Sequence, residues 1–348
     1  FVVLLIIGFA TGSFGLSLLA VTVYVICVFL YLPIRFNAML NTVVLAFTVI
    51  LIGYSSFLVL VIRSQANTPM DENNPENAVN LLSYLNREQY GTWPIVYGQY
   101  FSAPNDPQHP YLDGNPVYTQ DKRAGKYVIT DDRKNSIPNY DKRFCTLFPR
   151  MWSSQSNHVT GYKQWTDPSK YDRISVTDPQ TGDPTTIAKP TFGQNLWFFL
   201  DYQVGQMYGR YFLWNFVGRQ NDIQGFGNST DGNWITGIKP YDEARLGPQT
   251  GLPDGADNNK AHNTLYALPF LLGVIGLVYQ FMKDNKNAVV VGFLFLLTGI
   301  AIVIYLNQKP FEPRERDYAY AGSFYAYAIW IGLGVLAIFD FLQKRINQ

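Results

Sequence analysis

Two short charged clusters hold the side chains best suited to catalysis or to binding a charged ligand. The first follows a long apolar run and places adjacent Asp71 and Glu72 among Asn and Pro residues, close to Arg63. A carboxylate in such a loop could act as a general base on an acceptor hydroxyl, or could orient a sugar. The alternative is structural, because these acids would also complement the N-terminus of the helix expected over Asn77–Glu88, with Asn74 as its cap.

The second cluster, Lys309–Tyr318, opens the last apolar run and places five charges in six residues between prolines. Arg314 and Arg316 could bind a phosphate through bidentate, charge-assisted hydrogen bonds. Glu315 and Asp317 could hold those guanidinium groups in place or bind substrate hydroxyls. The alternative is an interfacial anchor, in which ion pairs lie above a belt of tyrosines.

Other familiar chemistry is missing from the sequence. There is no phosphate-binding glycine loop, no nucleophile elbow, no H-E-x-x-H and no C-x-x-C. His109, His158 and His262 lack the spacing of metal ligands, so we expect loop or surface histidines, no metal site and no certain cofactor. Cys27 and Cys145 fall in an apolar run and a polar region, and we do not expect them to form a disulfide.

The elements that must position both clusters are long apolar runs without charge. Runs of 19 or more such residues are long enough to cross a bilayer as helices. Five regions of the sequence meet this condition: Phe1–Leu32, Ala38–Ile62, Thr264–Met282, Ala288–Leu306 and Tyr318–Phe339. The expected fold class is therefore a membrane α-helical bundle of about five to six spans.

The first run is too long for one span and too short for two. A break at Gly12-Ser13-Phe14-Gly15 would leave Phe1–Thr11 as the tail of an earlier helix. The sequence starts without Met and has no signal-peptide pattern. We therefore expect the middle or C-terminal portion of a longer protein.

Between the second and third runs lies a region of different composition, Ser64–Asn263. It holds 16 of the 20 prolines, six of the seven tryptophans and all three histidines, which indicates a folded, loop-rich, mixed domain in water. Its 18 Lys and Arg against 21 Asp and Glu amount to a net charge of −3, so no nucleic-acid partner is expected. The domain plan is transmembrane helices over 1–63, this domain over 64–263, and three transmembrane helices over 264–348.

Basic residues in the short loops predict the orientation of the chain, since such loops favour the cytoplasm. They fall on one face if the spans alternate: Arg35, Lys283, Lys286, Lys344 and Arg345. The Ser64–Asn263 domain and the external charged loop 307–317 then lie outside. Lys309, Arg314 and Arg316 in that loop count against this orientation, and the parity of the other three loops outweighs them.

An aromatic segment, Asn195–Val217, has the length of a span but contains Asp201 and Arg210. Each would add about 2.5–3.5 kcal/mol at a bilayer centre, so we expect this helix not to cross. It is predicted to pack against the membrane bundle or to lie at its interface, the alternative being an ordinary buried helix of the outer domain. Gly205 and Gly209 form a small-xxx-small pair that would permit close approach of another helix.

Two blocks of sequence resemble a known family. They are IRSQANTPMDENNPENAVNLLSYLNREQYGTWPIVYGQYFSAP (Ile62–Pro104) and FEPRERDYAYAGSFY (Phe311–Tyr325). They look like large membrane proteins of Bacteroidetes, formerly a domain of unknown function and grouped with the GT-C glycosyltransferases. That family is related to the plexin-modifying protein O-mannosyltransferase of the vertebrate endoplasmic reticulum. The resemblance covers nearly the whole chain.

The resemblance implies an inner-membrane enzyme with a large periplasmic domain. It would move a sugar, mannose by analogy, from a polyprenyl-phosphate donor to Ser or Thr of an exported protein acceptor. It assigns catalytic roles to Asp71 and Glu72, and donor-phosphate binding to Arg63, Arg314 and Arg316. Glu315 and Asp317 would support these arginines. The first external loop, which carries the catalytic carboxylate in GT-C enzymes, has no counterpart here.

Two other classes of function stay open. One is a scaffold or partner subunit of an envelope export complex, because Tyr- and Trp-rich surfaces also suit partner binding. The other is a transporter of a lipid-linked sugar. Transporters usually have polar or broken spans at the midplane, and these runs contain few polar residues.

Overall fold

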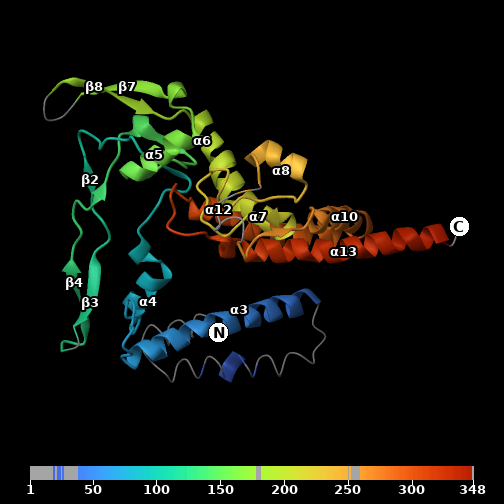
Figure 1. The fold of residues 1–348 in the computed structure, drawn as a ribbon. Coiled ribbons are helices and arrows are strands. Elements are labelled where there is room, and N and C mark those ends of the chain that lie inside the picture. The colour runs from blue at the N-terminus through green and yellow to red at the C-terminus, as the bar shows by residue number, and fades with distance from the viewer. Residues whose placement is uncertain are drawn as a thin grey trace. The chain divides into compact units, whose positions relative to one another are not determined.

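The computed structural model describes residues 19, 22–24, 26, 38–121, 123–177, 182–249, 251 and 259–346 (Figure 1). Most of Phe1–Leu32, with its expected break, lies outside the described residues, as do Cys27 and Arg35. The chain divides into two compact units, of which the first comprises residues 1–92 and 115–133 and the second residues 93–114 and 134–348. The sequence predicts a domain boundary at residue 64. The observed division is different, because most of the expected domain 64–263 belongs to the same unit as the last helices.

The first unit contains one long apolar helix and a short polar region. Its elements are α3 (Ala38–Gln65), α4 (Ala78–Leu85), the 3-10 turn η1 (Glu88–Tyr90) and the antiparallel pair β3 (Val117–Asp121) and β4 (Lys126–Asp131). The helix expected over Asn77–Glu88 is confirmed as α4. Its cap is Asn77, whose side chain accepts hydrogen bonds from the backbone amides of Val79 and Asn80. Asn74, the expected cap, instead contacts Ser64.

Three helices among the described residues are long and apolar enough to cross a bilayer. They are Asn41–Gln65 within α3, Asn285–Leu306, which joins α11 (Asn285–Thr298) to α12 (Ile300–Leu306), and Asp317–Ile346, which joins η5 (Asp317–Tyr320) to α13 (Ala321–Ile346). The run Thr264–Met282 forms a shorter apolar helix, α10 (Leu268–Lys283). The chain is thus a helical membrane protein.

Helices α10 and α13 lie side by side (Figure 1), and glycines allow this approach. A Cβ on Gly276 would lie 1.7 Å from the carbonyl oxygen of Trp330, and one on Gly334 would lie 2.1 Å from that of Leu272. Because both contacts are with backbone, no side-chain rotation could relieve them. This is small-residue packing of the kind common between membrane helices.

The outer part of the second unit consists of short antiparallel strand pairs and helices. The pairs are β1 (Tyr97–Gln99) with β6 (Cys145–Leu147), β2 (Tyr111–Leu112) with β5 (Ile137–Pro138), β7 (Asp172–Thr177) with β8 (Pro184–Lys189), and β9 (Gly218–Arg219) with β10 (Asn263–Thr264). The helical pieces are η2 (Lys142–Phe144), α5 (Ser156–Trp165), η3 (Pro168–Lys170) and α8 (Lys239–Leu246).

The expected aromatic helix is present and lies in the core of the second unit. It runs through α6 (Phe192–Phe198), an 11-residue π-helix η4 (Phe199–Gly209) and α7 (Arg210–Phe216). Rings on α7 pack on α10, α11 and α13, as the contacts of Phe212 with Phe270, Phe295 and Phe324 illustrate. The prediction that this segment packs against the apolar helices is therefore confirmed.

The expected role of Gly205 and Gly209 is wrong. Apart from the nearest backbone of the same helix, the described atom that a Cβ added at either glycine would meet within 4 Å is a carbonyl oxygen of that helix, that of Leu200 or Val204. Both carbonyls lie five residues earlier, which is the spacing of π-helical hydrogen bonds. The glycines therefore face the backbone of their own helix, and within the part of the chain that the structure describes no other helix comes within 4 Å of an added Cβ.

Candidate functional site

The charged loop 307–317 begins where α12 ends, and a single asparagine fixes its direction. Asn307 is buried and has a φ of 42°, in the left-handed region common after a helix end. Its Nδ2 donates hydrogen bonds to the carbonyls of Pro94 (2.8 Å) and Pro149 (2.9 Å). Its Oδ1 accepts a hydrogen bond from Nε2 of Gln203 in η4. The start of the loop is thus tied to three distant segments.

Side chains from the outer segments cover the last carbonyls of α12. Trp93 Nε1 donates to the carbonyl of Tyr305 (2.8 Å), and Arg150 Nη1 donates to that of Ile304 (3.0 Å). Arg150 is fully buried, and burial lowers its pKa to about 10. A cation at a helix C-terminus also matches the negative end of the helix dipole. The loop is therefore held on a rigid helix end.

Glu315 forms the most constrained ion pair of the second unit. Its Oε1 lies 3.0 Å from Nη1 of Arg210, and its Oε2 lies 2.7 Å from Nη2 of the same guanidinium. Tyr211 Oη donates to Oε2, and the Gly225 amide donates to Oε1 at 3.0 Å. Burial raises the pKa of Glu315, but these donors outweigh burial and hold the pKa below its ordinary value. Glu315 is therefore an ionised carboxylate with four donors.

Arg210 can be buried because a glycine-rich loop wraps its guanidinium. Nη1 donates to the carbonyl of Gly232 (2.8 Å), and Nε donates to that of Gln206 (3.0 Å). A Cβ on Gly225 or on Gly232 would lie 2.9 Å from Nη1. The loop thus approaches the arginine closely only because both positions lack a side chain.

Glu312 and Arg316 form a second ion pair in the same loop, with Oε2 of the acid 2.7 Å from Nη2 of the arginine. Glu312 is buried, whereas part of the Arg316 side chain is exposed. The backbone carbonyl of Glu312 accepts a hydrogen bond from Nε2 of Gln224. Two acid–arginine pairs therefore brace the loop, one of them on α7 and one within the loop.

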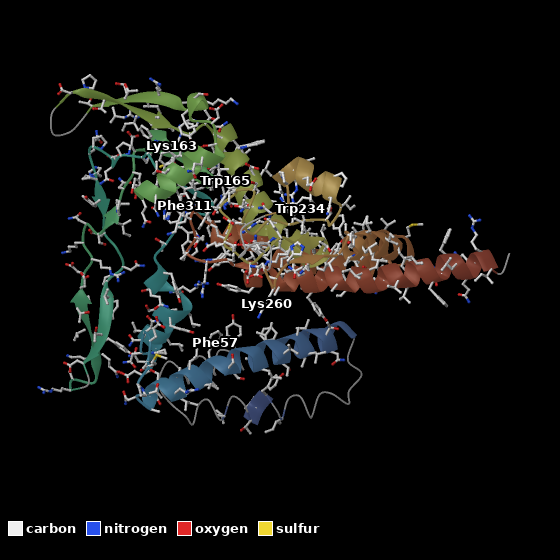
Figure 2. The ribbon with its side chains drawn as sticks, in the orientation of Figure 1. Phe57, Lys163, Trp165, Trp234, Lys260 and Phe311 are labelled. Carbon is white, nitrogen blue, oxygen red and sulfur yellow. The ribbon has the colours of Figure 1, made fainter. Side chains whose placement is uncertain are left out.

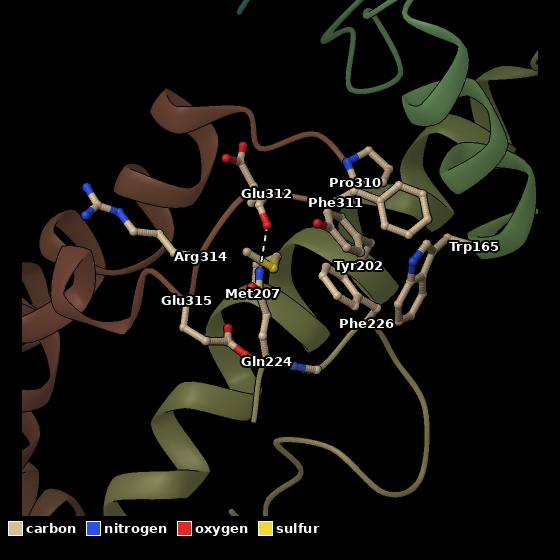
Figure 3. A pocket seen from close by; sticks show the side chains of 11 residues that line it. Trp165, Tyr202, Met207, Gln224, Phe226, Pro310, Phe311, Glu312, Arg314 and Glu315 are labelled. Carbon is tan, nitrogen blue, oxygen red and sulfur yellow. Dashed lines mark hydrogen bonds between the residues drawn. The ribbon is translucent and has the colours of Figure 1, made fainter. Parts of the chain in front are cut away.

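A pocket lies between this loop, α5, η4 and the segment after β9, as Figure 3 shows. The space between its lining residues amounts to about 330 Å³ when open solvent is included, and the part that can hold the centre of a water-sized sphere is about 10 Å³. The lining consists of Trp165, Tyr202, Met207, Gln224, Gly225, Phe226, Pro310, Phe311, Glu312, Arg314 and Glu315. Rings gather on one side and the charged side chains on the other (Figure 3).

The rings of the pocket are held in place by neighbours. Trp165 lies against Tyr202 with ring centroids 5.2 Å apart, and Phe226 lies against Phe311 at 5.6 Å. Trp165 and Phe311, both labelled in Figure 2, line this wall together (Figure 3). Phe311 has a φ of 58°, which is uncommon for an aromatic residue and costs about 1–3 kcal/mol. Such backbone strain occurs often at ligand sites, which supports a binding role for this wall.

The remaining candidates of the loop differ in exposure. Arg314 is exposed at the pocket, and its guanidinium lies 5.8 Å from the centroid of the Tyr318 ring. Asp317 is half-buried and begins η5. Of the two predicted phosphate-binding arginines in this loop, Arg314 lines the pocket, whereas Arg316 is engaged by Glu312. Glu315 pairs with Arg210, and not with the arginines it was expected to support.

The first charged cluster belongs to the first unit. Ser64 is buried at the end of α3, with Oγ 2.9 Å from Oδ2 of Asp71 and 3.0 Å from Oδ1 of Asn74. Asp71 is half-buried, and Glu72 and Arg63 are exposed. The turn thus brings Asp71 back to the helix end. The prediction that this loop and the charged loop 307–317 line one cleft stays a prediction.

One expectation about the histidines is wrong. His158 lies within α5 and is buried, with Nδ1 2.8 Å from Oγ of Ser153. Burial lowers its pKa, and the charge of Lys309 lowers it further. Its neutral ring can either accept a hydrogen bond from the Ser153 hydroxyl or donate one to it. His158 is therefore a buried histidine with a hydrogen-bond partner, and not the loop or surface residue that was expected. No group of three or more metal-binding side chains occurs among the residues that the structure describes.

Sequence reasoning did not assign Arg210, Gln224 or the pocket rings to the site. A signal for Arg210 was present, because a charged residue inside an aromatic helix needs a partner of opposite charge. The identity of that partner was not readable, since Arg210 and Glu315 are 105 positions apart.

Comparison with known proteins adds one match. Residues 91–200 match a family of unknown function, DUF8416. No curated protein and no solved structure matches the chain. The matched segment contains Trp93, Arg150, His158 and Trp165, so it supplies the residues that cover the end of α12 and one ring of the pocket.

Proposed function

We propose that the chain is part of a GT-C-type membrane glycosyltransferase. It would move a sugar from a polyprenyl-phosphate donor to Ser or Thr of exported proteins, with mannose as the first sugar to test. In this proposal the protein spans a bacterial inner membrane five or six times. The outer segments of the second unit and the external charged loop 307–317 lie in the periplasm.

The pocket beside the start of η5 carries the proposal. Sugar rings stack on aromatic side chains through their C–H faces, and their hydroxyls bind carboxylates and amides. Trp165 and Phe311 provide the first kind of contact. Gln224 and Glu312 provide groups of the second kind. Because η5 and α13 form a candidate span, the pocket lies at a span end, where the headgroup of a lipid-linked sugar would be presented.

Within this proposal, Arg314 is the residue that contacts the donor phosphate. It is exposed at the pocket, its guanidinium lies beside the Tyr318 ring, and no side chain among the described residues forms an ion pair with it, so it can offer its donors to an anion. Arg316 and Glu315 position the loop through their partners Glu312 and Arg210. As negative charge develops on the departing phosphate, a bidentate contact from Arg314 would strengthen. Asp71 and Glu72 are the candidate bases in this chain, and Arg63 is a second candidate for the phosphate.

The test measures sugar transfer and donor affinity for the full-length protein in nanodiscs. The probes are a polyprenyl-phosphate mannose and a Ser-containing peptide. Arg314→Lys keeps the charge but loses the bidentate geometry, so we expect turnover to fall at least about tenfold. The matched control is Arg245→Lys, because Arg245 is also exposed and lies over a ring, that of Trp234, outside the pocket.

Two outcomes would contradict the assignment. Normal turnover and affinity in Arg314→Lys would mean that the pocket is not the phosphate site and would favour the interfacial anchor. An equal loss in Arg245→Lys would show that folding, and not phosphate binding, is affected. Asp71→Asn and Glu72→Gln test which carboxylate is the general base. The variant that lacks the base should transfer sugar about 100-fold or more slowly while it still binds the donor.

A docking subunit is the alternative that one observation favours. The paired strands β2 and β5 expose Tyr111, Leu112 and Ile137. Exposed apolar side chains on such a two-stranded ribbon are typical of a surface that binds another protein. A purified full-length protein that transfers no sugar, but captures a defined envelope protein through this ribbon, would support docking over catalysis.

A further inference from the structure

An apolar edge of the second unit is exposed although the unit has a large buried core. We define this aromatic edge as Val96, Tyr97, Leu147, Phe148, Leu200 and Tyr305. Val96, Tyr97, Leu147 and Leu200 are each more than half exposed. Single exposed apolar residues need no explanation, but a contiguous group on several elements does.

Contacts between neighbouring segments make the edge contiguous. Tyr97 and Leu147 are directly opposed in the β1–β6 pair, and the Phe148 amide donates to the carbonyl of Val96. The Phe148 ring meets the Phe199 ring edge-on at 5.1 Å. Phe199 precedes Leu200 in η4, and η4 packs on α12. The edge therefore runs from β1–β6 across η4 to α12.

The same edge is bonded to the outer end of a candidate span. Trp93 Nε1 donates to the carbonyl of Tyr305, and the two rings are 6.4 Å apart. Arg150 joins the carbonyls of Ile95 and Ile304, and its guanidinium lies 3.8 Å from the centre of the Phe148 ring. Tyr305 is the last exposed large side chain of the span Asn285–Leu306. The aromatic edge is therefore continuous with the surface that this span presents to lipid.

We infer that the aromatic edge lies in the headgroup region of the bilayer, so that lipid and not a protein covers it. Tyr and Trp accumulate at this depth because their rings are apolar and their tips are polar. An apolar face at the interface is typically buried about 5–10 Å into the boundary of headgroups and acyl chains. The outer part of the second unit would then rest on the membrane beside its own span, independently of the proposed activity.

The experiment uses the full-length protein, with Cys27 and Cys145 replaced by Ala, in phosphatidylcholine vesicles. A bimane fluorophore is attached to Leu147→Cys or to Leu200→Cys on the edge. The matched control is Leu112→Cys, an exposed leucine of the strand pair β2–β5 outside the edge. Quenching is measured with brominated phosphatidylcholine and with aqueous iodide.

We expect brominated lipid to quench both edge positions at least about twofold more strongly than position 112. Bromines near the headgroup end of the acyl chain should quench more than bromines at its middle. Strong quenching of the edge by iodide alone would place it in water and overturn the inference. Protection of the edge from both quenchers would mean that protein covers it, and this result would also overturn the inference.

Discussion

The helix pair α10–α13 and the aromatic outer core are packed by opposite means. Gly276 and Gly334 let the two helix backbones touch, and Gly273 leaves room for the Tyr327 ring of α13 against α10. Tyr327 Oη donates to the carbonyl of Phe270, and Trp330 Nε1 donates to Gln280. The helices are therefore held by close backbone contact and a few hydrogen bonds.

The outer core uses rings and a buried ion pair. Phe198 meets Tyr162 and Tyr202 with ring centroids 5.0 Å from each. Arg210 and Glu315 cross this core from α7 to the external charged loop. Aromatic burial of this kind is effective where the alternative is exposure to water.

The two regions are packed differently because each would expose its packed surface to a different solvent if its elements separated. Lipid chains are as apolar as the side chains, so burial between membrane helices gains little and close fit must supply the attraction. In water, burying rings is favourable in itself, and a paired charge can then be accommodated among them. Each region should accordingly fail under a different kind of substitution.

The largest effect is expected from Arg210→Met, which leaves the Glu315 carboxylate, only 17% exposed, without its main partner. Breaking a buried pair in this way costs about 3–5 kcal/mol. The free energy of unfolding is measured by denaturant titration in detergent micelles at neutral pH. Lys170→Met is the control, because both side chains of the Lys170–Asp167 pair are exposed, and little change is expected.

The same variant has a pH signature. In the native protein the pKa of Glu315 is lowered, so the pair stabilises the fold above the ordinary carboxyl pKa and is lost in acid. In Arg210→Met, Tyr211 and Gly225 still donate to Glu315, but without the guanidinium burial raises that pKa above its native value, and protonation would relieve the unpaired charge. The difference in stability between the two proteins should therefore shrink as pH falls. A difference that stays constant down to acid pH would contradict the ion-pair account.

A smaller loss of stability is expected from Gly276→Ala in the helix pair α10–α13. Its Cβ would overlap the Trp330 carbonyl, and overpacking of this kind costs about 1–3 kcal/mol. Gly292→Ala in α11 is the matched control, since no described atom beyond its own stretch of helix lies within 4 Å of a Cβ there. The free energy of unfolding of the control should be unchanged or should rise by up to about 1 kcal/mol, because alanine has a higher helix propensity than glycine. Equal behaviour of the two variants in the unfolding titration would argue against glycine-mediated contact.

The smallest effect concerns His158, whose pKa is lowered by burial and by Lys309. A depressed pKa means that the unfolded chain binds the proton more readily. Stability present above pH 6.5, the ordinary histidine value, should therefore decline as pH falls below it. His158→Asn can keep a hydrogen bond to Ser153 but cannot take up the proton. Its thermal unfolding temperature should vary less between neutral and mildly acid pH than that of the native protein.

Much of the membrane architecture could be predicted from the sequence. A charge-free run of sufficient length can satisfy its backbone in lipid only as a helix, so Ala38–Ile62, Ala288–Leu306 and Tyr318–Phe339 were readable as α3, α11–α12 and α13. Asp201 and Arg210 likewise indicated that the aromatic segment belongs with protein. These inferences need only local composition.

The site needed the tertiary structure. The sequence marked the external charged loop 307–317 as unusual, but not that Arg314 alone of its two candidate arginines would line a pocket. It also did not show that Glu315 would bind Arg210, or that Trp165 and Phe226 would face Phe311. The ion pair that a carboxylate forms depends on distance and on desolvation in the folded protein. Residues about a hundred positions apart come close only when the chain has packed. The sequence by itself determined where helices and charges occur, whereas the packed core decided which charges pair and which stay free to bind.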